Sequence, residues 1–332
     1  MKRTTLLAAA AAITLALGPA APARSGTVTD VLDQARQRIG PVLLARDVLA
    51  QPGDEIALEA GLRTGLRLTG IEGKRVQFLL GTQLLGEVLT PKGGDVALRW
   101  KVPAQPGDHA ITVRLHPEDQ PEKPIEDASL LVAARPPEAP LVVVDLDKTV
   151  VASGFAWVLV GGAQPMAGAS VVLTRLAGDH TIVYLTHRPD FLGPRSKRWL
   201  ADNAFPRGPV LTSTLGGFVA GSEAYKSGRL ESIRLTYKNV TAGIGDKFSD
   251  ARAYADKGLR SILILDVDWS EAKAEYFEKL ADELAALPAP VQVVTNWSEI
   301  SAILYNKVEF SKQAMERRLR DMARQLRSKP KP

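Results

Sequence analysis

Five short apolar segments in the second half of the chain constrain its fold more than any other feature. Each has the length of a buried strand, and the stretches between them have the length and apolar spacing of helices. Strands that alternate with helices in this way form a parallel sheet covered on both faces. Residues 141–296 are therefore predicted to form a doubly wound α/β domain. The segments are 141–145, 181–186, 240–246, 261–266 and 291–294, with 209–211 as a candidate sixth.

Residues 41–135 have a different pattern of apolar and polar residues. Short runs there alternate between apolar and polar residues, as in the run where Val96, Leu98 and Trp100 fall on one face of a strand. Several such strands separated by turn sequences predict a small all-β sandwich of immunoglobulin-like build. No reactive side chains gather in this region, so we expect a spacer or docking module. The proline-rich residues 136–140 are predicted to link the two domains.

The first residues of the chain are typical of a signal peptide. Lys2 and Arg3 precede an apolar run at 6–17, and small residues at 21–23 offer a cleavage site. Residues 1–23 are therefore predicted to direct export, which places the protein in the periplasm or outside the cell. An uncleaved anchor remains the alternative, although the apolar run is short for a membrane span.

Composition excludes several functions. The chain has no cysteine, which excludes a thiol nucleophile and thiolate zinc sites. Its formal net charge is +5, but residues 307–332 alone contain nine basic and three acidic residues. The basic character therefore belongs mainly to the C-terminal tail, and we expect no nucleic-acid partner.

Residues 297–332 are predicted to form one long amphipathic helix with a basic outer face, followed by a short tail. Its apolar residues recur at intervals of three or four or their multiples. This pattern has two readings: a helix that packs on the domain with a solvated outer face, or a helix that docks on an anionic membrane. The apolar positions include Leu304, Val308, Met315, Leu319, Met322 and Leu326.

Reactive side chains follow three of the predicted strands. The carboxyl ends of parallel strands meet at one edge of the sheet, so we expect these side chains to lie close together. An Asp-x-Asp-x-Thr sequence taken alone is also typical of a simple strand-end turn. The set consists of Asp145 and Asp147 after the first strand, Thr186 after the second, Asp246 and Asp250 after a later one, and Lys226 at the start of a helix.

This arrangement resembles the haloacid dehalogenase (HAD) superfamily, with its four motifs in order. Within that superfamily it is most similar to the catalytic domain of the lipin and actin-patch type of phosphatidate phosphatase. The likeness covers roughly residues 141–267. It includes Tyr184-Leu185-Thr186-His187-Arg188-Pro189, residues 205–211, and Lys226 followed by Leu230 and Ile233. Lys148 departs from the pattern, because many relatives have Gly or Asp there.

The resemblance implies a Mg²⁺-dependent phosphatase with a HAD-like Rossmannoid sheet and no large cap domain. Asp145 would be the nucleophile and Asp147 the acid/base partner. The metal ligands would be Asp145, the main-chain carbonyl of Asp147, Asp246 and Asp250, the last directly or through water. Thr186 and Lys226 would contact the phosphate and complete the catalytic set.

Three assignments stay open at this level. Arg188 is either a further phosphate contact or a structural ion-pair partner. Lys238 competes with Lys226 as the motif lysine, although Lys226 is favoured because it begins a helix. Asp266-Val267-Asp268-Trp269-Ser270 looks like a second copy of the nucleophile motif, and we interpret it as a strand-end turn and helix cap.

The predicted function is hydrolysis of a phosphate monoester, phosphatidate or a related phospholipid phosphate. One alternative is a phosphatase for soluble esters. The other is a protein that binds phospholipid without hydrolysing it. Contact with an anionic membrane through the basic C-terminal helix would suit a lipid substrate.

Overall fold

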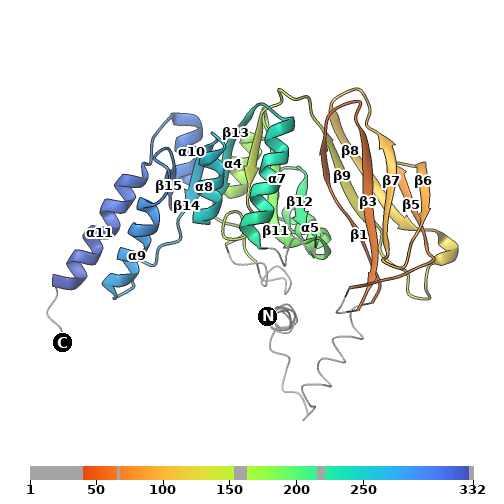
Figure 1. Ribbon diagram of the computed structural model, residues 1–332, viewed down its shortest axis with the longest axis horizontal. Coiled ribbons are helices and arrows are strands. Elements are labelled where there is room, and N and C mark those ends of the chain that lie inside the picture. The colour runs from red at the N-terminus through yellow and green to blue at the C-terminus, as the bar shows by residue number, and fades with distance from the viewer. Residues whose placement is uncertain (1–39, 66–67, 153–162, 215–220, 329–332) are drawn as a thin grey trace, which may run out of the picture.

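The protein is described by a computed structural model that covers residues 40–65, 68–152, 163–214 and 221–328. The predicted signal peptide therefore lies outside the described residues. Among the residues described, no helix is long and apolar enough to cross a membrane. Figure 1 shows an all-β region beside a mixed α/β region, with the helices of the C-terminal part at the far end.

The central sheet of the α/β region is parallel, as predicted. Within the described residues its strands are arranged in the order β12-β11-β10-β13-β14-β15. By chain position this is the order 3-2-1-4-5-6, which is the doubly wound arrangement. The strands are β10 (Leu141–Val144), β11 (Thr181–Pro189), β12 (Val210–Ser213), β13 (Val240–Gly245), β14 (Arg260–Ile264) and β15 (Gln292–Val294).

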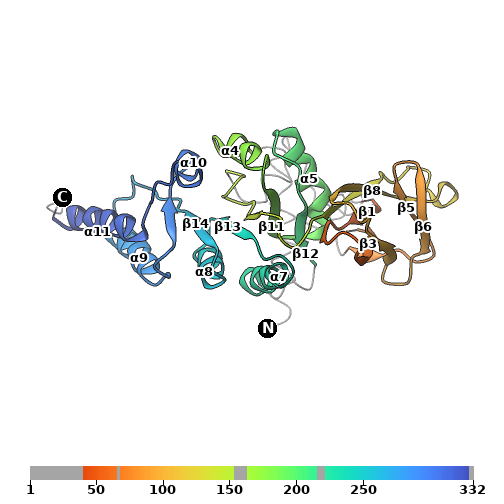
Figure 2. The same ribbon diagram turned by 90° about the horizontal axis from the view of Figure 1, so that it is seen from above.

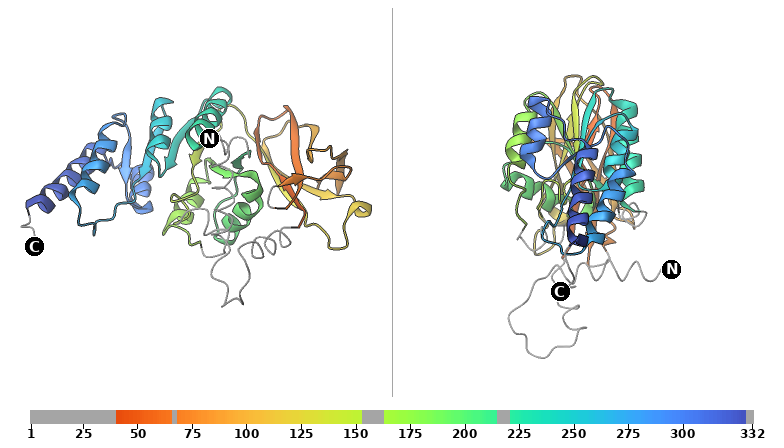
Figure 3. Two further views of the ribbon diagram at one scale, coloured as in Figure 1. Left: turned by 60° about the horizontal axis from the view of Figure 1, so that its bottom comes forward. Right: turned by 90° about the vertical axis from the view of Figure 1, so that its left-hand side faces the viewer.

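Helices cover both faces of this sheet. Figure 2, together with the right-hand view of Figure 3, places α4, α5 and α10 on one face and α7 and α8 on the other. Beyond β14, α9 and α11 pack around the end of the sheet. The helices are α4 (Ala169–Leu176), α5 (Gly193–Asp202), α7 (Ser222–Thr236), α8 (Phe248–Asp256), α9 (Ala274–Ala285), α10 (Trp297–Asn306) and α11 (Lys312–Ser328).

Strand β10 lies at the centre of the sheet and is apolar at every position. Val142 and Val144 pack in the core beneath α4 and α10, whereas Leu141 and Val143 pack beneath α7 and α8. Successive side chains of a strand point to opposite faces, so a strand covered on both faces must be apolar throughout. This burial fixes the strand end from which Asp145 follows.

The all-β region is made of two sheets with a shared core. One sheet has the order β1-β3-β4 with β7 beside β3, and the other has the order β2-β9-β8-β5-β6. Leu58, Phe78 and Ile111 are fully buried between the two sheets. The strands are β1 (Val42–Ala45), β2 (Val48–Ala50), β3 (Glu55–Thr64), β4 (Thr69–Gly70), β5 (Arg75–Leu80), β6 (Gln83–Leu89), β7 (Asp95–Lys101), β8 (Gly107–Leu115) and β9 (Ala128–Ala134).

The prediction of one long helix from residue 297 is wrong. Helix α10 ends at Asn306, its C-cap Lys307 adopts a left-handed conformation (φ 55°), and α11 begins only at Lys312. Between the helices the chain returns to β15, where Val293 N–H donates to the Phe310 carbonyl (2.8 Å). Apolar residues continue at helical intervals on both sides of this break, so spacing alone could not reveal it.

The two helices bury their apolar residues in different places. Helix α10 packs against α4 in the core on one face of the sheet, whereas α11 packs against α9. Leu319 and Ala323 of α11 are buried, and Met315, Met322 and Leu326 are partly buried beside them. The apolar face of α11 is therefore occupied by the protein itself, which supports the packing-helix reading.

A glycine in β13 tests the packing around the sheet centre. A Cβ atom at Gly243 would lie 2.2 Å from Cγ of the buried Tyr254 ring, so Gly243→Ala should lower the free energy of unfolding by about 1–3 kcal/mol. Gly228 in α7 is the matched control, because a Cβ there meets nothing within 4 Å. Gly228→Ala should raise stability by about 0.5–1 kcal/mol. Urea unfolding of both variants measures this, and equal effects would contradict the close approach.

Candidate active site

Strands β10 and β13 are neighbours in the sheet although β11 and β12 lie between them in the sequence. Such a reversal of strand order opens a crevice at the carboxyl ends of the strands, where doubly wound folds bind ligands. Asp145 directly follows β10, and Asp246 directly follows β13. The Asp145 N–H donates to the Ile244 carbonyl (2.9 Å), which ties the two strand ends together. Asp250 reaches the same sheet edge from the first turn of α8.

Lys226 links two of these acids. Its Nζ lies 2.8 Å from Asp145 Oδ1 and 2.6 Å from Asp250 Oδ2, and all three side chains are at least 95% buried. Burial disfavours the ammonium, but the two carboxylates outweigh burial and raise the pKa of Lys226 above its ordinary value. Lys226 therefore stays charged and holds both acids in place. Lys238, the rival lysine, instead makes a main-chain hydrogen bond to Pro137.

Asp246 is the least satisfied acid of the group. Its Oδ1 is buried and has no hydrogen-bond partner among the described residues. Burial and then the charges of Asp145 and Asp250 raise the pKa of Asp246 to about 7. Burial, with the nearby Asp145, also raises the pKa of Asp250, against the opposing effect of Lys226.

These acids fit a divalent cation. One carboxylate oxygen from each of Asp145, Asp246 and Asp250 lies within 4.8 Å of the others. Hard cations such as Mg²⁺ prefer oxygen ligands of this kind. A cation would satisfy the unpartnered oxygen of Asp246 and offset the repulsion that raises its pKa. The donor set therefore fits the metal that the sequence implied.

Asp147 does not share its carboxylate with this group. Arg188 binds it through two hydrogen bonds, from Nε to Oδ2 (3.0 Å) and from Nη2 to Oδ1 (2.6 Å). The remaining Nη1 of Arg188 donates to Ser196 Oγ (2.9 Å), and only 2% of the Arg188 side chain is exposed. Of the two sequence readings for Arg188, the ion-pair partner is the one seen in this structure. A bidentate pair of this kind fixes the orientation of the carboxylate.

The other predicted residues also lie at this strand edge. Thr186 is fully buried within β11, and its Oγ1 accepts a hydrogen bond from the Arg188 N–H (3.2 Å). Lys148 adopts a left-handed conformation (φ 55°) and extends toward Asp266, with its Nζ 3.6 Å from Oδ2. The ammonium of Lys148 therefore points toward the next strand end rather than at Asp145.

The look-alike motif at 266–270 is a turn. Asp268 Oδ1 accepts hydrogen bonds from Ser270 N–H (2.9 Å) and Ser270 Oγ (2.6 Å). The predicted helix cap is wrong, because α9 begins later, at Ala274, and its N-cap is Lys273.

Sequence reasoning missed Ser196, which completes the hydrogen bonding of Arg188. Nothing in the local sequence marks this serine, because its role depends on how α5 folds back over β11. It also missed Tyr254, whose fully buried ring lies against Gly243 below the acids. The only sequence signal for this contact was Gly243 itself, because a glycine inside a buried strand often marks a place where another group packs closely against the backbone.

The raised pKa of Asp246 makes stability depend on pH when no metal is bound. Between pH 4 and 7 the folded carboxyl keeps its proton while the unfolded chain has lost it, so the free energy of unfolding should fall as pH rises through this window. Asp246→Asn removes this effect. In the presence of a chelator it should therefore gain on the order of 2 kcal/mol more over the wild type at pH 8 than at pH 4.

Urea unfolding at the two pH values measures this difference. Asp266→Asn is the control, since the Asp266 side chain is 74% exposed and should show no such pH-dependent gain. An Asp246→Asn gain that is the same at both pH values would contradict a buried, repelled carboxylate.

Comparison with solved structures gives only weak likenesses. Fibronectin(III)-like modules of Clostridium thermocellum CbhA match 29% of this chain and 47% of their own, at 19% identity and a TM-score of 0.21. A Paenibacillus cycloisomaltooligosaccharide glucanotransferase matches 74% of this chain and 36% of its own, at 12% identity and a TM-score of 0.26. A Bifidobacterium dentium beta-glucuronidase matches 76% and 43%, at 10% identity and a TM-score of 0.26. The chain thus spans less than half of each of these proteins.

Comparison with protein families is more specific. No curated protein matches the chain significantly. Residues 142–267 match the family model for the LNS2 domain of PITM 1-3, a lipin-like domain related to the HAD phosphatases. The matched segment begins in β10 and ends just after β14, so it contains every predicted site residue.

Proposed function

We propose that this protein is a Mg²⁺-dependent phosphomonoester hydrolase of the HAD type, acting on phosphatidate or a related phospholipid phosphate outside the cytoplasm. The observation that carries the proposal is the buried array of Asp145, Lys226 and Asp250 beside the unpartnered oxygen of Asp246. A protein that only binds phosphate gains nothing from three crowded acids. The LNS2 match supports both the phosphatase chemistry and the phospholipid.

Phosphate monoesters carry negative charge and repel an anionic nucleophile, so positive charge must lie beside the reacting groups. Lys226 supplies one such charge next to Asp145. A Mg²⁺ ion held by Asp145, Asp246, Asp250 and the Asp147 carbonyl would supply further charge to offset this repulsion. Thr186 would donate a hydrogen bond to a phosphoryl oxygen from its buried position at the end of β11.

Asp145 then attacks phosphorus and forms an aspartyl-phosphate, as the leaving alkoxide departs. Asp147 gives that alkoxide its proton and later accepts a proton from the water that attacks the aspartyl-phosphate. Arg188 holds both carboxylate oxygens of Asp147, which sets the direction from which the proton is transferred. Asp145 thus acts as the nucleophile and is held by Lys226, whereas Asp147 transfers the protons and is held by Arg188.

The nucleophile and the acid can be tested separately. Asp145→Asn should abolish release of phosphate, because an amide does not attack phosphorus. Asp147→Asn should lower turnover by a factor of about 10²–10⁴, the usual worth of a general acid. Asp268→Asn, in the look-alike turn, is the matched control and should turn over at the wild-type rate.

The assay is phosphate release with Mg²⁺, with chelator, and with Mg²⁺ restored. Phosphatidate in vesicles and soluble esters such as sugar phosphates and nucleotides are compared side by side. Near-normal turnover by Asp145→Asn would remove the mechanism. A strong preference for soluble esters would replace the lipid substrate, and binding of phosphatidate without any turnover would make the protein a lipid binder.

Contact with an anionic membrane must use the outer face of α11, because the apolar face of this helix packs inside the protein. Arg317 and Arg318 are exposed on that face, and the Arg318 guanidinium lies 4.1 Å from the ring centre of Trp269. Trp269 follows β14 at the same sheet edge as the acids. Other arginines of the helix already have acidic partners, such as Arg320 with Asp282 and Glu316.

Removing these two charges should weaken vesicle binding. Arg317→Gln/Arg318→Gln should lower affinity for vesicles rich in anionic lipid by about tenfold to thirtyfold, at about 1 kcal/mol for each basic residue. Lys92→Gln/Arg99→Gln removes the same charge from exposed positions of the sandwich and should have little effect. Co-sedimentation with vesicles measures both, and equal losses in the two variants would contradict docking through α11.

A further inference from the structure

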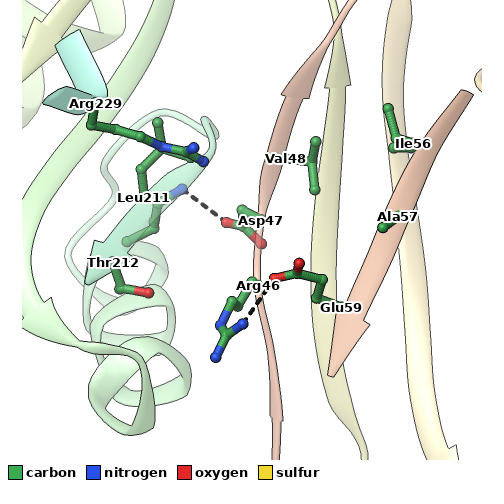
Figure 4. Close-up of a pocket in the computed structure, with 10 residues that line it drawn as sticks. Arg46, Asp47, Val48, Ile56, Ala57, Glu59, Leu211, Thr212 and Arg229 are labelled. Carbon is green, nitrogen blue, oxygen red and sulfur yellow. Dashed lines mark hydrogen bonds and ion pairs between the residues drawn. The ribbon is translucent and has the colours of Figure 1, made fainter. Parts of the chain in front are cut away.

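The sandwich contacts the α/β region at the corner between β1 and β2, where Arg46 and Asp47 lie. Figure 4 shows these two side chains facing Leu211 and Thr212 of β12. Together with other residues of both domains they line a cavity of about 320 Å³. Both residues make specific polar contacts with the other domain. Their partners in that domain are Asp190, Lys197 and Val210, which belong to the segment after Arg188 and to the two elements that contact Arg188.

Asp47 is buried and bridges the two domains. Its Oδ1 accepts from the Leu131 N–H of the sandwich (2.7 Å), and its Oδ2 accepts from the Val210 N–H of β12 (2.8 Å). Lys197 of α5 pairs with the same carboxylate, with Nζ 2.6 Å from Oδ1. Both carboxylate oxygens of Asp47 thus help to join the sandwich to β12 and α5.

Both of those elements hold Arg188. In β12, Ser213 Oγ donates to the main-chain carbonyls of His187 (2.8 Å) and Arg188 (3.3 Å). In α5, Ser196 accepts from the Arg188 guanidinium, and the next residue is Lys197, which binds Asp47. Lys197 also donates to the Ser129 carbonyl of the sandwich (2.8 Å).

Arg46 binds the segment that follows Arg188 in the sequence. Its Nε and Nη2 both donate to Asp190 Oδ2, at 3.1 and 2.7 Å, and its Nη1 pairs with Glu59 of β3 (2.8 Å). Asp190 begins the short 3-10 turn (Asp190–Leu192) that starts two residues after Arg188. The sandwich therefore fixes the segment that follows Arg188 as well as the two elements that flank it.

We propose that the sandwich is a positioning device for the acid/base step, in which Arg46 and Asp47 hold the Arg188 segment so that Arg188 orients Asp147. This inference rests on the proposed phosphatase function. A mere spacer would need no such arrangement. Another ion pair between the domains, Arg198 with Glu126, is far more exposed, at 70% and 87%. Arg135 makes a further contact to the Thr181 hydroxyl (2.7 Å) at the start of β11, but the contacts of Arg46 and Asp47 are the ones that reach the elements around Arg188.

The dependence of kcat/KM on the leaving group distinguishes this role from a purely structural one, which would lower kcat/KM equally for all substrates. An alkyl phosphate needs a proton on its leaving oxygen, whereas 4-nitrophenyl phosphate departs with little help from an acid. Arg46→Gln and Asp190→Asn should each lower kcat/KM for a short-chain phosphatidate about tenfold, because small misplacements of a catalytic group are costly. The same variants should change kcat/KM for 4-nitrophenyl phosphate by less than about threefold.

Arg198→Gln is the matched control, since it breaks an ion pair between the same two domains and should leave both substrates unaffected. Asp190→Asn breaks the same ion pair while keeping the shape of the side chain, so the test can still be made if Arg46→Gln fails to fold. Equal losses on the two substrates, or losses no larger than those of Arg198→Gln, would overturn the proposal.

Hydrogen exchange followed by mass spectrometry provides a second arm that needs no turnover. Residues 188–200 should exchange faster in Arg46→Gln than in the wild type or in Arg198→Gln. If the wild type hydrolyses neither substrate, the proposed function fails and the acid/base role fails with it, and this arm then tests only whether Arg46 orders the Arg188 segment. Unchanged exchange in that segment would then overturn the positioning role.

Discussion

The candidate site depends on one buried ammonium between two buried carboxylates. Lys226 lies within 2.8 Å of Asp145 and 2.6 Å of Asp250, and none of the three side chains is more than 5% exposed. Removing one member of such a group leaves an uncompensated buried charge, which is strongly unfavourable. The arrangement is nevertheless one negative charge in excess even before Asp246 is counted. Burial, together with this excess of negative charge, raises the pKa of Asp246, and the excess is what a divalent cation would offset.

Two separate sets of contacts position the residues around this centre. The strand order brings the ends of β10 and β13 together, so Asp145 and Asp246 meet without any special loop. Arg188 holds Asp147 at the same sheet edge through a separate set of contacts. Lys197, next to Ser196, and Asp190, two residues after Arg188, in turn bind the sandwich, so the N-terminal region is joined to the segment that holds the proposed acid Asp147. The acids proposed to hold the metal, by contrast, are positioned by the α/β region itself.

Much of this fold was predictable. Parallel strands that are buried on both faces must be apolar throughout, so they can be recognised in the sequence as continuous apolar runs such as 141–145. The co-location of Asp145, Asp246, Asp250 and Lys226 followed from the rule that strand ends share an edge. The break at Lys307 was not predictable, since the apolar spacing continues through it. The inter-domain contacts of Arg46 and Asp47 were also not predictable, because their partners in the α/β region lie more than 140 residues away and depend on how the two domains meet. Periodicity reports which face of an element is buried, but it does not report what covers that face.

The most direct test is to look for a phosphoryl group on the protein. Wild-type protein mixed with Mg²⁺ and a phosphate monoester is quenched in acid within its first turnover, digested, and examined by mass spectrometry. The account predicts one phosphoryl group on the peptide that contains Asp145, and none when Asp145 is replaced by Asn. Release of phosphate with no modified peptide, or with the phosphoryl group on another residue, would contradict it.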